Sequence, residues 1–208
     1  MNLASLLHMH GPLVLASQSP RRLALLRQMG CEPRVVPADV PEHLHAAGEG
    51  PGTYASALAQ EKARVVWTSV PPESIVIAAD TIVVIDEEIL NKPVDEADAV
   101  RMLRRLSGRT HTVITAVCVR TATSDIVRQS TTRVTFRTLG DEEIGAYVRS
   151  GSPMDKAGAY GIQDDFGAVF VRHIEGCYYT IVGLPLAMLY EMLRELTVRE
   201  TDRAGGVA

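Results

Sequence analysis

Apolar positions follow two different spacings along this chain, and each spacing predicts one kind of element. Short continuous apolar runs predict buried strands at residues 13–16, 35–36 and 74–79, and residues 83–85 either extend the third run or form the next strand. Apolar residues at helical spacing predict helices. Their expected ranges are residues 20–29, 54–67, 95–106 and 141–148, with a last helix that follows Pro185 and ends near Arg199.

The second half of the chain adds alternating apolar and polar residues, which indicate strands with one solvated face. Residues 110–120 and 126–137 alternate in this way and predict an antiparallel pair. Residues 168–174 and 178–182 predict a hairpin with a tight turn between them. Residues 150–165 show no sustained period and are rich in Gly, Ser and Asp, so they are expected to form a loop.

Strands and helices are mixed along the whole sequence, with no internal repeat and no linker-like segment. This mixture indicates an α/β fold class and a single domain over residues 13–199, open to a division into two lobes. Residues 1–12 and 200–208 are predicted to be flexible tails.

The first strand leads into a helix whose start could bind an anion. Ser19 suits the N-cap position, and a helix N-terminus presents unpaired N–H groups. Ser17 adds a hydroxyl, and Arg21 and Arg22 add permanent positive charge. Two cations in a first helical turn oppose the helix dipole, and a bound phosphate would offset that cost. The alternative is that Ser19 only caps the helix while both arginines are solvated, and spacing alone does not decide.

Asp80 is the second candidate group, because it follows a buried apolar run. A carboxylate at the end of a strand lies where α/β folds collect ligands, and beside phosphates it could hold Mg²⁺ or orient a water molecule. A structural role for Asp80 in a turn is equally compatible with the sequence. Lys92 is a candidate phosphate contact in a loop, whereas Lys62 alone resembles an ordinary surface residue of a helix.

Two further segments have side chains that need an interpretation. Residues 154–163 combine Lys156 and Gln163 with glycines around an aromatic residue, which suits either a ligand-reading loop or a plain connector. The arginines at positions 101, 104 and 105 are expected on a solvated helix face, and His111 is expected to be a strand residue with a structural hydrogen bond.

The sequence contains neither a Walker A motif nor a GxGxxG motif after a strand, so Walker ATPases and Rossmann dehydrogenases lose their main support.

The composition narrows the classes of protein that remain. With 208 residues, 46% of them hydrophobic and 22% charged, the chain can bury a full core and is not of the disordered class. Its net charge of -4 argues against nucleic acid as a partner but leaves a small anionic ligand open. Three widely spaced cysteines indicate free thiols in the reducing cytoplasm, and no apolar run is long enough to predict a membrane span.

Seven motifs, each weak alone, occur together in one order and resemble the Maf family of nucleoside triphosphate pyrophosphatases. The resemblance covers residues 13–196. The motifs are LASQSPRR at residues 15–22, EKA at 61–63, AADT ending at Thr81, NKP at 91–93, MLRRLSGRTHTVITAV at 102–117, MDKAGAYGIQ at 154–163 and VGLP at 182–185. This sequence differs from the family pattern in two places. Asn91 stands where the family usually has Gly before Lys-Pro, and Asp164 follows Gln163 where the family commonly has Gly.

The resemblance implies a fold, an activity and a set of site residues. It implies a single ITPase-like α/β domain with a mixed twisted sheet, flanking helices and a cleft between two lobes, often as a homodimer. It implies hydrolysis of nucleotides between the α- and β-phosphates with a divalent cation, Mg²⁺ or Mn²⁺. By motif, Asp80 resembles the proton acceptor, and Glu42, in the loop after Pro41, resembles a metal-associated carboxylate. The remaining positions resemble substrate-binding residues: Ser17, Ser19, Arg21, Arg22, Lys62, Thr81, Lys92, Lys156 and Gln163.

The predicted substrates are dTTP and UTP, because Lys156 and the AGAYGIQ string resemble the subgroup that acts on them. A subgroup that cleaves 7-methyl-GTP has a different loop there, and its activity is the alternative within the family. The residues are also compatible with two further functions. One is a nucleotide-binding regulator of growth or division with little catalysis, and the second is an NTPase that releases orthophosphate.

Overall fold

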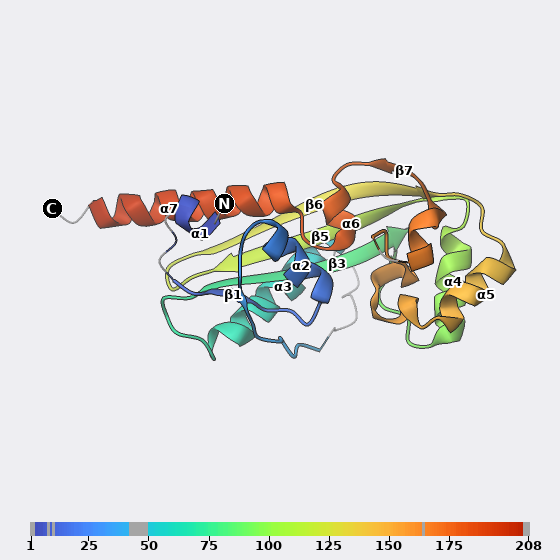
Figure 1. The fold of residues 1–208 in the computed structure, drawn as a ribbon, viewed down its shortest axis with the longest axis horizontal. Helices are drawn as coiled ribbons and strands as arrows, with labels where there is room; N and C mark the ends of the chain where they lie inside the picture. Colours follow the sequence, from blue (N-terminus) through green and yellow to red (C-terminus); the bar gives the residue numbers. More distant parts are fainter. Residues whose placement is uncertain (1–2, 8, 10, 42–49, 164, 206–208) are drawn as a thin grey trace.

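A seven-stranded mixed sheet runs through the molecule in the order β2-β1-β3-β5-β6-β7, with β4 paired to β3 beside this path (Figure 1). The computed structural model describes residues 3–7, 9, 11–41, 50–163 and 165–205. The strands are β1 (Leu13–Leu15), β2 (Arg34–Val35), β3 (Ile75–Ile85), β4 (Glu88–Leu90), β5 (Thr110–Arg120), β6 (Asp125–Phe136) and β7 (Val171–Glu175). The predicted α/β fold class and the antiparallel pair β5–β6 are thereby confirmed.

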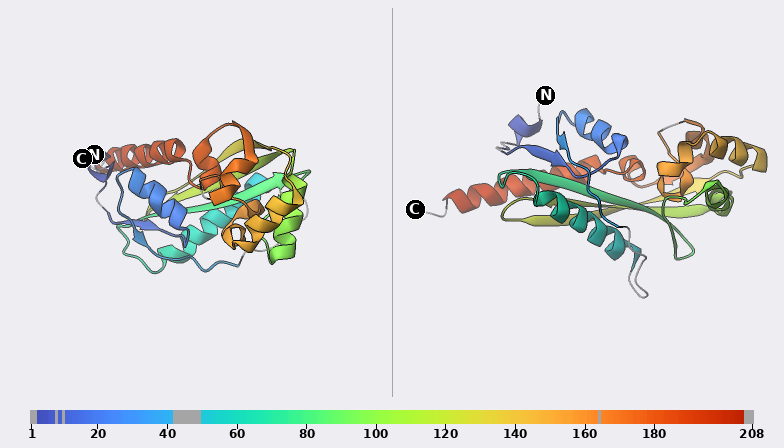
Figure 2. Two further views of the ribbon diagram at one scale, coloured as in Figure 1. Left: turned by 45° about the vertical axis from the view of Figure 1, so that its right-hand side comes forward. Right: turned by 90° about the horizontal axis from the view of Figure 1, so that it is seen from below.

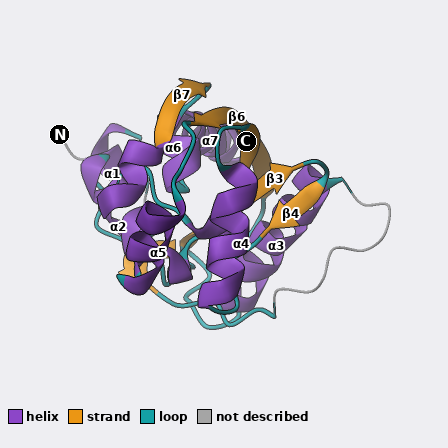
Figure 3. Cartoon of the chain, turned by 90° about the vertical axis from the view of Figure 1, so that its right-hand side faces the viewer, coloured by secondary structure: helices purple, strands orange, loops and turns teal. Residues whose placement is uncertain are grey.

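Helices cover both faces of the sheet and one of its ends. They are α1 (Leu3–Leu6), α2 (Pro20–Gln28), α3 (Pro51–Trp67), α4 (Glu96–Leu106), α5 (Asp141–Arg149), α6 (Tyr178–Val182) and α7 (Leu186–Gly205), with short 3₁₀ turns η1 (Ser152–Asp155), η2 (Ala157–Ala159) and η3 (Asp165–Phe170). Helix α3 lies on one face of the sheet, and α1, α2 and α7 lie on the other (Figure 2). Helices α4 and α5 pack together at the end of the molecule that faces the viewer in Figure 3. None of the helices in the described part of the chain has the length and hydropathy of a bilayer span.

The core follows from the alternation of side chains along β3, which is buried on both faces. Ile77 and Ala79 belong to one apolar cluster with α2 and α7, while Val76 and Ala78 belong to another with α3. Further along the strand, Val83 belongs to a third cluster with α4 and α5. One strand therefore supplies residues to three packing regions, and it connects the two ends of the molecule.

Strand β3 has two different neighbours on the same edge. Residues 75–77 pair in parallel with β1, and residues 83–85 pair in antiparallel fashion with β4. Residues 78–82 lie between these two ladders. The prediction that Asp80 follows the strand is wrong in detail, since β3 continues through it to Ile85. The apolar run at residues 83–85 extends the strand. Asp80 lies beside an open stretch of the strand edge, because neither β1 nor β4 pairs with residues 78–82.

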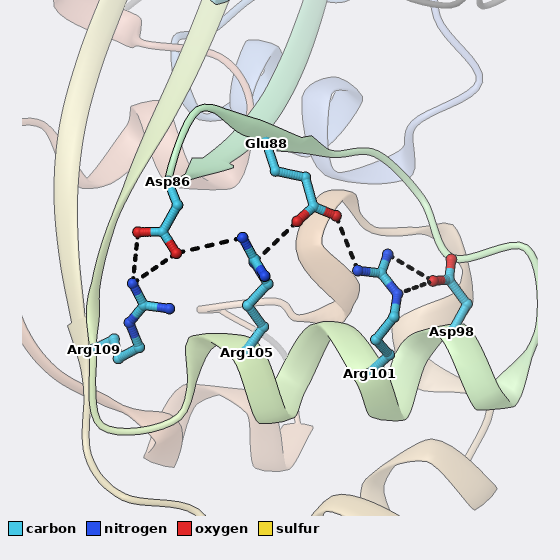
Figure 4. Close-up of polar contacts among 6 residues, drawn as sticks. All are labelled: Asp86, Glu88, Asp98, Arg101, Arg105 and Arg109. Carbon is cyan, nitrogen blue, oxygen red and sulfur yellow. Dashed lines mark hydrogen bonds and ion pairs between the residues drawn. The ribbon is translucent and has the colours of Figure 1, made fainter.

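Strands β3 and β4 form a tight hairpin whose two loop residues, Asp86 and Glu87, have φ values of 49° and 66°. Such left-handed conformations are required by a type I′ turn, where Gly or Asn is usual. Ion pairs hold the Asp86 carboxylate: Arg109 Nη2 lies 2.7 Å from Oδ1, and Arg105 Nη2 lies 3.4 Å from Oδ2 (Figure 4). These contacts offset part of the cost of the turn.

The arginines of α4 are therefore not simply a solvated helix face, as the sequence predicted. Arg101 Nη1 lies 2.9 Å from Glu88 Oε1 and Arg105 Nε lies 3.0 Å from Glu88 Oε2, so both bind the first residue of β4 in the hairpin (Figure 4). Arg104 Nε lies 2.8 Å from Asp141 Oδ1 and connects α4 to α5. The charges are exposed but paired, because acidic residues of the neighbouring elements face the helix.

Residues 178–182 form helix α6, so the predicted hairpin with residues 168–174 is wrong. Five aromatic and β-branched residues fit a strand or a helical turn equally well, and only tertiary contacts decide. Here Thr132 Oγ1 accepts a hydrogen bond from Cys177 N and donates one to Cys177 O, both at 3.0 Å, which fixes the start of the helix. Strand β7 pairs with β6 instead.

The two ends of the chain also differ from the sequence prediction. Helix α7 continues to Gly205, although the predicted end was near Arg199. At the other end, α1 lies within the segment predicted as a tail, and Leu3 and Leu7 are buried against the cluster of α2 and α7. Helix α3 begins at Pro51, three residues before the predicted start, because proline suits the first helical position.

Candidate active site

A cavity of about 430 Å³ lies where the ladder beside β3 is interrupted. Its walls come from the loop after β1, from α3, from the segment after β4 and from the 3₁₀ turns, so both ends of the molecule contribute. Its lining includes ten residues that the sequence singled out: Ser17, Ser19, Arg21, Arg22, Lys62, Asp80, Thr81, Lys92, Lys156 and Gln163. Glu42 and Asp164 lie outside the described residues. The fold thus brings together groups that are as much as 146 positions apart, from Ser17 to Gln163.

The loop after β1 has the predicted cap. Ser19 is the N-cap of α2, and its hydroxyl accepts a hydrogen bond of 3.5 Å from Arg22 N. Pro20 occupies the first turn, where a missing N–H costs nothing. Ser17 is buried, and its Oγ accepts from Ser19 N at 3.1 Å and from Arg22 Nη1 at 3.2 Å. The loop is therefore held in one shape by its own hydroxyls.

Arg22 is fixed by neutral oxygen atoms of three separate segments. Besides Ser17 Oγ, its Nε donates to Gly183 O at 2.9 Å and its Nη2 donates to Thr81 Oγ1 at 3.0 Å. Gly183 has a φ of 111°, and a Cβ there would lie 3.3 Å from Thr81 Oγ1 and 3.5 Å from Arg22 Nε. Glycine is thus favoured at this position of the VGLP motif by its left-handed backbone conformation, and a Cβ would also crowd Thr81 Oγ1.

Asp80 and Lys62 form the most buried ion pair of the cavity. Lys62 Nζ lies 2.5 Å from Asp80 Oδ1, and the two side chains are only 13% and 7% exposed. Lys62 is therefore not an ordinary surface residue, as the sequence alone suggested. Among the residues that the structure describes, no side chain forms a hydrogen bond with the second carboxylate oxygen, Oδ2. Within the described part of the chain, Lys62 therefore holds the carboxylate through one of its two oxygens.

Asp155 joins two of the predicted cations. Arg21 Nη1 lies 2.7 Å from its Oδ2, and Lys156 Nζ lies 2.8 Å from its Oδ1. Burial alone would raise the pKa of Asp155, but hydrogen bonds from Lys156 and Arg21 outweigh it and lower that pKa. Lys156 is buried and also donates to Ser152 O at 2.5 Å. Arg21 and Lys156 thus enter the cavity wall already bound to a common carboxylate.

The segment after β4 reaches the cavity next to the Gly-rich string. Asn91 O accepts a hydrogen bond of 3.1 Å from Gly158 N, and Lys92 follows as an exposed residue of the cavity wall. Gly158 has a φ of 67°, and a Cβ there would approach Val83 to 2.8 Å. Asn91, one departure from the family pattern, therefore acts here through its backbone carbonyl.

A rigid aromatic group supports the wall formed by Tyr160. His111 Nε2 and Tyr160 Oη are 2.8 Å apart, and both rings pack edge-on against Phe136. Burial lowers the pKa of His111 to about 3 and raises that of Tyr160. His111 is therefore a neutral structural residue at neutral pH, which confirms the sequence interpretation.

The oxygen donors of the cavity decide whether a divalent cation fits. The described residues place three carboxylates in the lining of the cavity: Asp80, the exposed Asp39, and Asp155, which is bound to Arg21 and Lys156. No group of three or more His, Cys, Asp or Glu placed to share a metal ion occurs within the described part of the chain. Magnesium is commonly held by one or two carboxylates together with substrate phosphates. The donors fit that mode of binding, and the described residues do not form a complete protein cage.

Three residues of this arrangement were not assigned a role from the sequence. Asp155 directly precedes Lys156 in the Gly-rich string, so the candidate Lys156 could have drawn attention to this carboxylate as its partner. Gly183 precedes a Leu-Pro pair, which is typical of a helix stop. Thr115 is buried in β5 and binds Thr81 Oγ1 at 2.9 Å, and nothing in an alternating strand with several threonines distinguishes it.

Comparison with known proteins gives relatives along nearly the whole chain. A dTTP/UTP pyrophosphatase of Koribacter versatilis is 54% identical over 89% of this chain and 95% of that protein, and one of Aquifex aeolicus is 48% identical over the same shares. A solved structure, a nucleoside-triphosphatase / dITP/XTP pyrophosphatase from Mycobacterium abscessus, has a TM-score of 0.43 at 17% identity, covering 90% of this chain and 97% of that one. The sequence profile described as Maf-like protein matches residues 12–196, so this chain belongs to the Maf family.

Proposed function

We propose that this protein hydrolyses nucleoside triphosphates to nucleoside monophosphate and pyrophosphate. The observation that carries the proposal is the buried Lys62–Asp80 pair in a cavity lined by further cations. The volume of about 430 Å³ is within the range of small-molecule sites. Two relatives that this chain covers at 95% of their length are dTTP/UTP pyrophosphatases, which supports dTTP and UTP as the substrates.

In the proposed reaction Asp80 accepts a proton from a water molecule. The water oxygen forms a bond to the α-phosphorus, the bond from that phosphorus to the bridging oxygen breaks, and pyrophosphate leaves. Lys62 binds Oδ1 of Asp80 and fixes the carboxylate, so that Oδ2 is the oxygen able to take the proton. General base catalysis of this type contributes about 10²–10⁴-fold to the rate.

The cations are proposed to bind the triphosphate and the charge that develops on the leaving group. Arg22 has a fixed guanidinium, and rigid donors stabilise a transition state without reorganisation. Lys92 approaches from the opposite end of the molecule, so the two can contact different phosphates. Arg21 and Lys156 can bind phosphate oxygens only by sharing or leaving Asp155.

A divalent cation, Mg²⁺ or Mn²⁺, is proposed as the cofactor, held by Asp80 with Glu42 and the phosphates of the substrate. Bound there, it would neutralise phosphate charge and polarise the phosphoryl group. Removal of divalent cations with EDTA is expected to abolish turnover, and added Mg²⁺ or Mn²⁺ is expected to restore it. Full turnover in EDTA would contradict this part of the proposal.

The substitution Asp80→Asn tests the reaction. It keeps the shape and a hydrogen-bonding oxygen for Lys62 but removes the base, so turnover should fall about 10²–10⁴-fold. Binding of the triphosphate, measured by calorimetry with Mg²⁺, should remain. Asp86→Asn is the matched control, because Asp86 is an ion-paired carboxylate of the hairpin outside the cavity. Near-normal turnover of the Asp80 variant would overturn the assignment.

A substrate panel separates the candidate functions. The purified protein is incubated with Mg²⁺ and dTTP, UTP, the remaining common nucleoside triphosphates and 7-methyl-GTP, and the products are identified. Pyrophosphate with the monophosphate supports the proposal, and fastest turnover of dTTP and UTP supports the base preference. Orthophosphate with diphosphate would indicate an orthophosphate-releasing NTPase, and no turnover of any nucleotide would favour a binding protein.

We infer a cytoplasmic protein that acts as a homodimer without nucleic acid. All three cysteines are free, and burial raises the pKa of the Cys118 thiol to about 12, which keeps it unreactive in a reducing compartment. Light scattering of the purified protein tests the dimer, and fractionation of the source cells tests the location.

A further inference from the structure

A chain of hydroxyl groups connects Arg22 with the interior of the sheet. Arg22 Nη2 donates to Thr81 Oγ1 at 3.0 Å, and Thr81 Oγ1 lies 2.9 Å from Thr115 Oγ1. Thr115 Oγ1 in turn donates to Thr180 O at 2.7 Å. Thr115 is fully buried and is not among the residues that line the cavity.

The direction of every hydrogen bond in this chain can be deduced. A hydroxyl has one proton, and a carbonyl oxygen only accepts, so the Thr115 proton belongs to Thr180 O. The proton between the two hydroxyls must then come from Thr81. Thr81 accepts from Arg22 and donates to Thr115, which means that toward any ligand it can act only as an acceptor.

The same contacts close a ring through helix α6. Arg22 binds Gly183 O at the end of α6 through Nε, and Thr115 binds Thr180 O within the helix. Helix α6 therefore holds two of the three guanidinium nitrogens, Nε directly and Nη2 indirectly through β3 and β5, while Nη1 binds Ser17 Oγ. Loss of the Thr115 hydroxyl would leave Thr81 without its acceptor, and it would free the Thr81 hydroxyl to rotate away from Arg22.

We propose that Thr115 is a positioning residue, which orients Arg22 through Thr81 for binding of the triphosphate. The inference rests on the proposed function, because Arg22 is assigned there to the phosphates. Thr115 touches no substrate, and its contribution is the fixed direction of the hydroxyl chain. An arginine oriented in advance binds an anion with less reorganisation, and small errors of position at a reacting centre lower rates considerably.

Two substitutions at Thr115 and one elsewhere test this role. Thr115→Val keeps the shape and removes the hydroxyl, and it should lower kcat/KM for the triphosphate about tenfold. Thr115→Ser keeps the hydroxyl and should remain within about twofold of the unaltered protein. Thr121→Val is the control: Thr121 is also buried, and its hydroxyl accepts a hydrogen bond of 3.4 Å from Thr123 N in the turn after β5, outside α6 and outside the lining of the cavity.

The comparison of these variants separates positioning from stability. Each of Thr115→Val and Thr121→Val removes one buried hydroxyl and should lower Tm by no more than about 2–4 °C, while only Thr115→Val lowers kcat/KM. In an Arg22→Lys background, Thr115→Val should have less than about a twofold further effect, because the single ammonium of lysine lacks the separate, fixed N–H groups with which the guanidinium binds Gly183 and Thr81. An equal loss of kcat/KM in Thr121→Val, or an undiminished tenfold effect in the Arg22→Lys background, would overturn the proposal.

Binding of inorganic pyrophosphate, measured by calorimetry, separates failure of this proposal from failure of the proposed function. If the unaltered protein hydrolyses no nucleotide, the proposed function fails. The positioning role is then judged on pyrophosphate affinity alone, which Thr115→Val should weaken about tenfold and Thr115→Ser should retain. Equal affinity of unaltered protein and Thr115→Val would overturn it.

Discussion

The arginine of the cavity and the arginines of α4 show two ways in which a protein holds a guanidinium. Arg22 donates to the neutral oxygens of Ser17, Thr81 and Gly183, which come from three separate segments. Arg101 and Arg105 instead bind acidic side chains at the protein surface, as Figure 4 shows. The neutral contacts fix a direction without cancelling charge, whereas the acidic contacts cancel it.

The difference teaches that orientation and charge can be supplied by different partners. Exposed ion pairs contribute about 0–1 kcal/mol each, and salt weakens them. Buried polar contacts contribute little net energy when complete, but removal of one partner is costly. The contrast therefore predicts large effects at the cavity and small effects on α4.

The largest expected effect follows from Lys62→Met, which would leave Asp80 buried without its cation. Breaking a buried ion pair costs about 3–5 kcal/mol, and this loss should appear in the free energy of unfolding at pH 7. The double variant Lys62→Met/Asp80→Asn should recover most of it, because the uncompensated charge is gone. A loss below about 1 kcal/mol for Lys62→Met would place the pair with the surface ion pairs and remove the contrast.

His111 provides the next test, through pH. Its pKa of about 3 in the folded protein lies below the ordinary 6.5, so the unfolded chain takes up the proton first. Stability should be complete above pH 6.5 and should fall by about 2 kcal/mol between pH 6.5 and 5.0, at 1.36 kcal/mol per pH unit. Urea unfolding of the unaltered protein and of His111→Gln across this window should show that the decrease is smaller in the variant. Identical slopes would contradict the assignment.

Asp155→Asn tests the intermediate case, a carboxylate that is 57% exposed but binds two cations of the cavity. Solvent screening limits the expected loss to about 1 kcal/mol at pH 7. Because the folded-state pKa of Asp155 is lowered, its contribution is present above its ordinary value of 3.8 and is lost as the pH falls through the lowered value. Unfolding curves of variant and unaltered protein should therefore converge in acid and stay apart at pH 7.

The smallest effect is expected for Arg105→Gln on α4. Its ion pairs with Asp86 and Glu88 are exposed, so the free energy of unfolding should change by less than about 1 kcal/mol and kcat/KM by less than about twofold. The difference should shrink further in roughly 0.5 M salt, which screens exposed charges. A loss as large as that of Lys62→Met would show that the hairpin contacts support the cavity as strongly as the buried pair.

Features decided by neighbours in the sequence could be predicted well. Ser19 and Pro20 identify the start of α2, and Asp95 caps α4 by accepting from Asp98 N at 2.7 Å. The strands β5 and β6 follow from alternation alone. The Maf motifs also identified, from the sequence, ten residues that line one cavity in the structure. The individual roles of these residues stay predictions.

Features decided by distant contacts could not be predicted. Lys62 resembled a surface residue because its partner, Asp80, stands 18 positions away on another element. Residues 178–182 form a helix because the buried Thr132 holds Cys177, which no local pattern shows. Asp80 appeared to end a strand because the interruption belongs to the neighbouring ladder and not to β3 itself.

The interrupted edge of β3 also sets the distance between the two strands that flank the site. Both flanking ladders are in register with the same strand, and the last residue paired with β1 and the first paired with β4 are Ile77 and Val83. At about 3.3 Å per residue, this separation is about 20 Å. Without a β-bulge, a single inserted residue would turn every following side chain to the opposite face of the sheet, so a regular strand can change the separation only in steps of two residues, about 6.6 Å. The register of the sheet therefore sets the length of the opening beside β3, and this length cannot change continuously. Differences between substrates of similar length have to be recognised by the loops around the cavity.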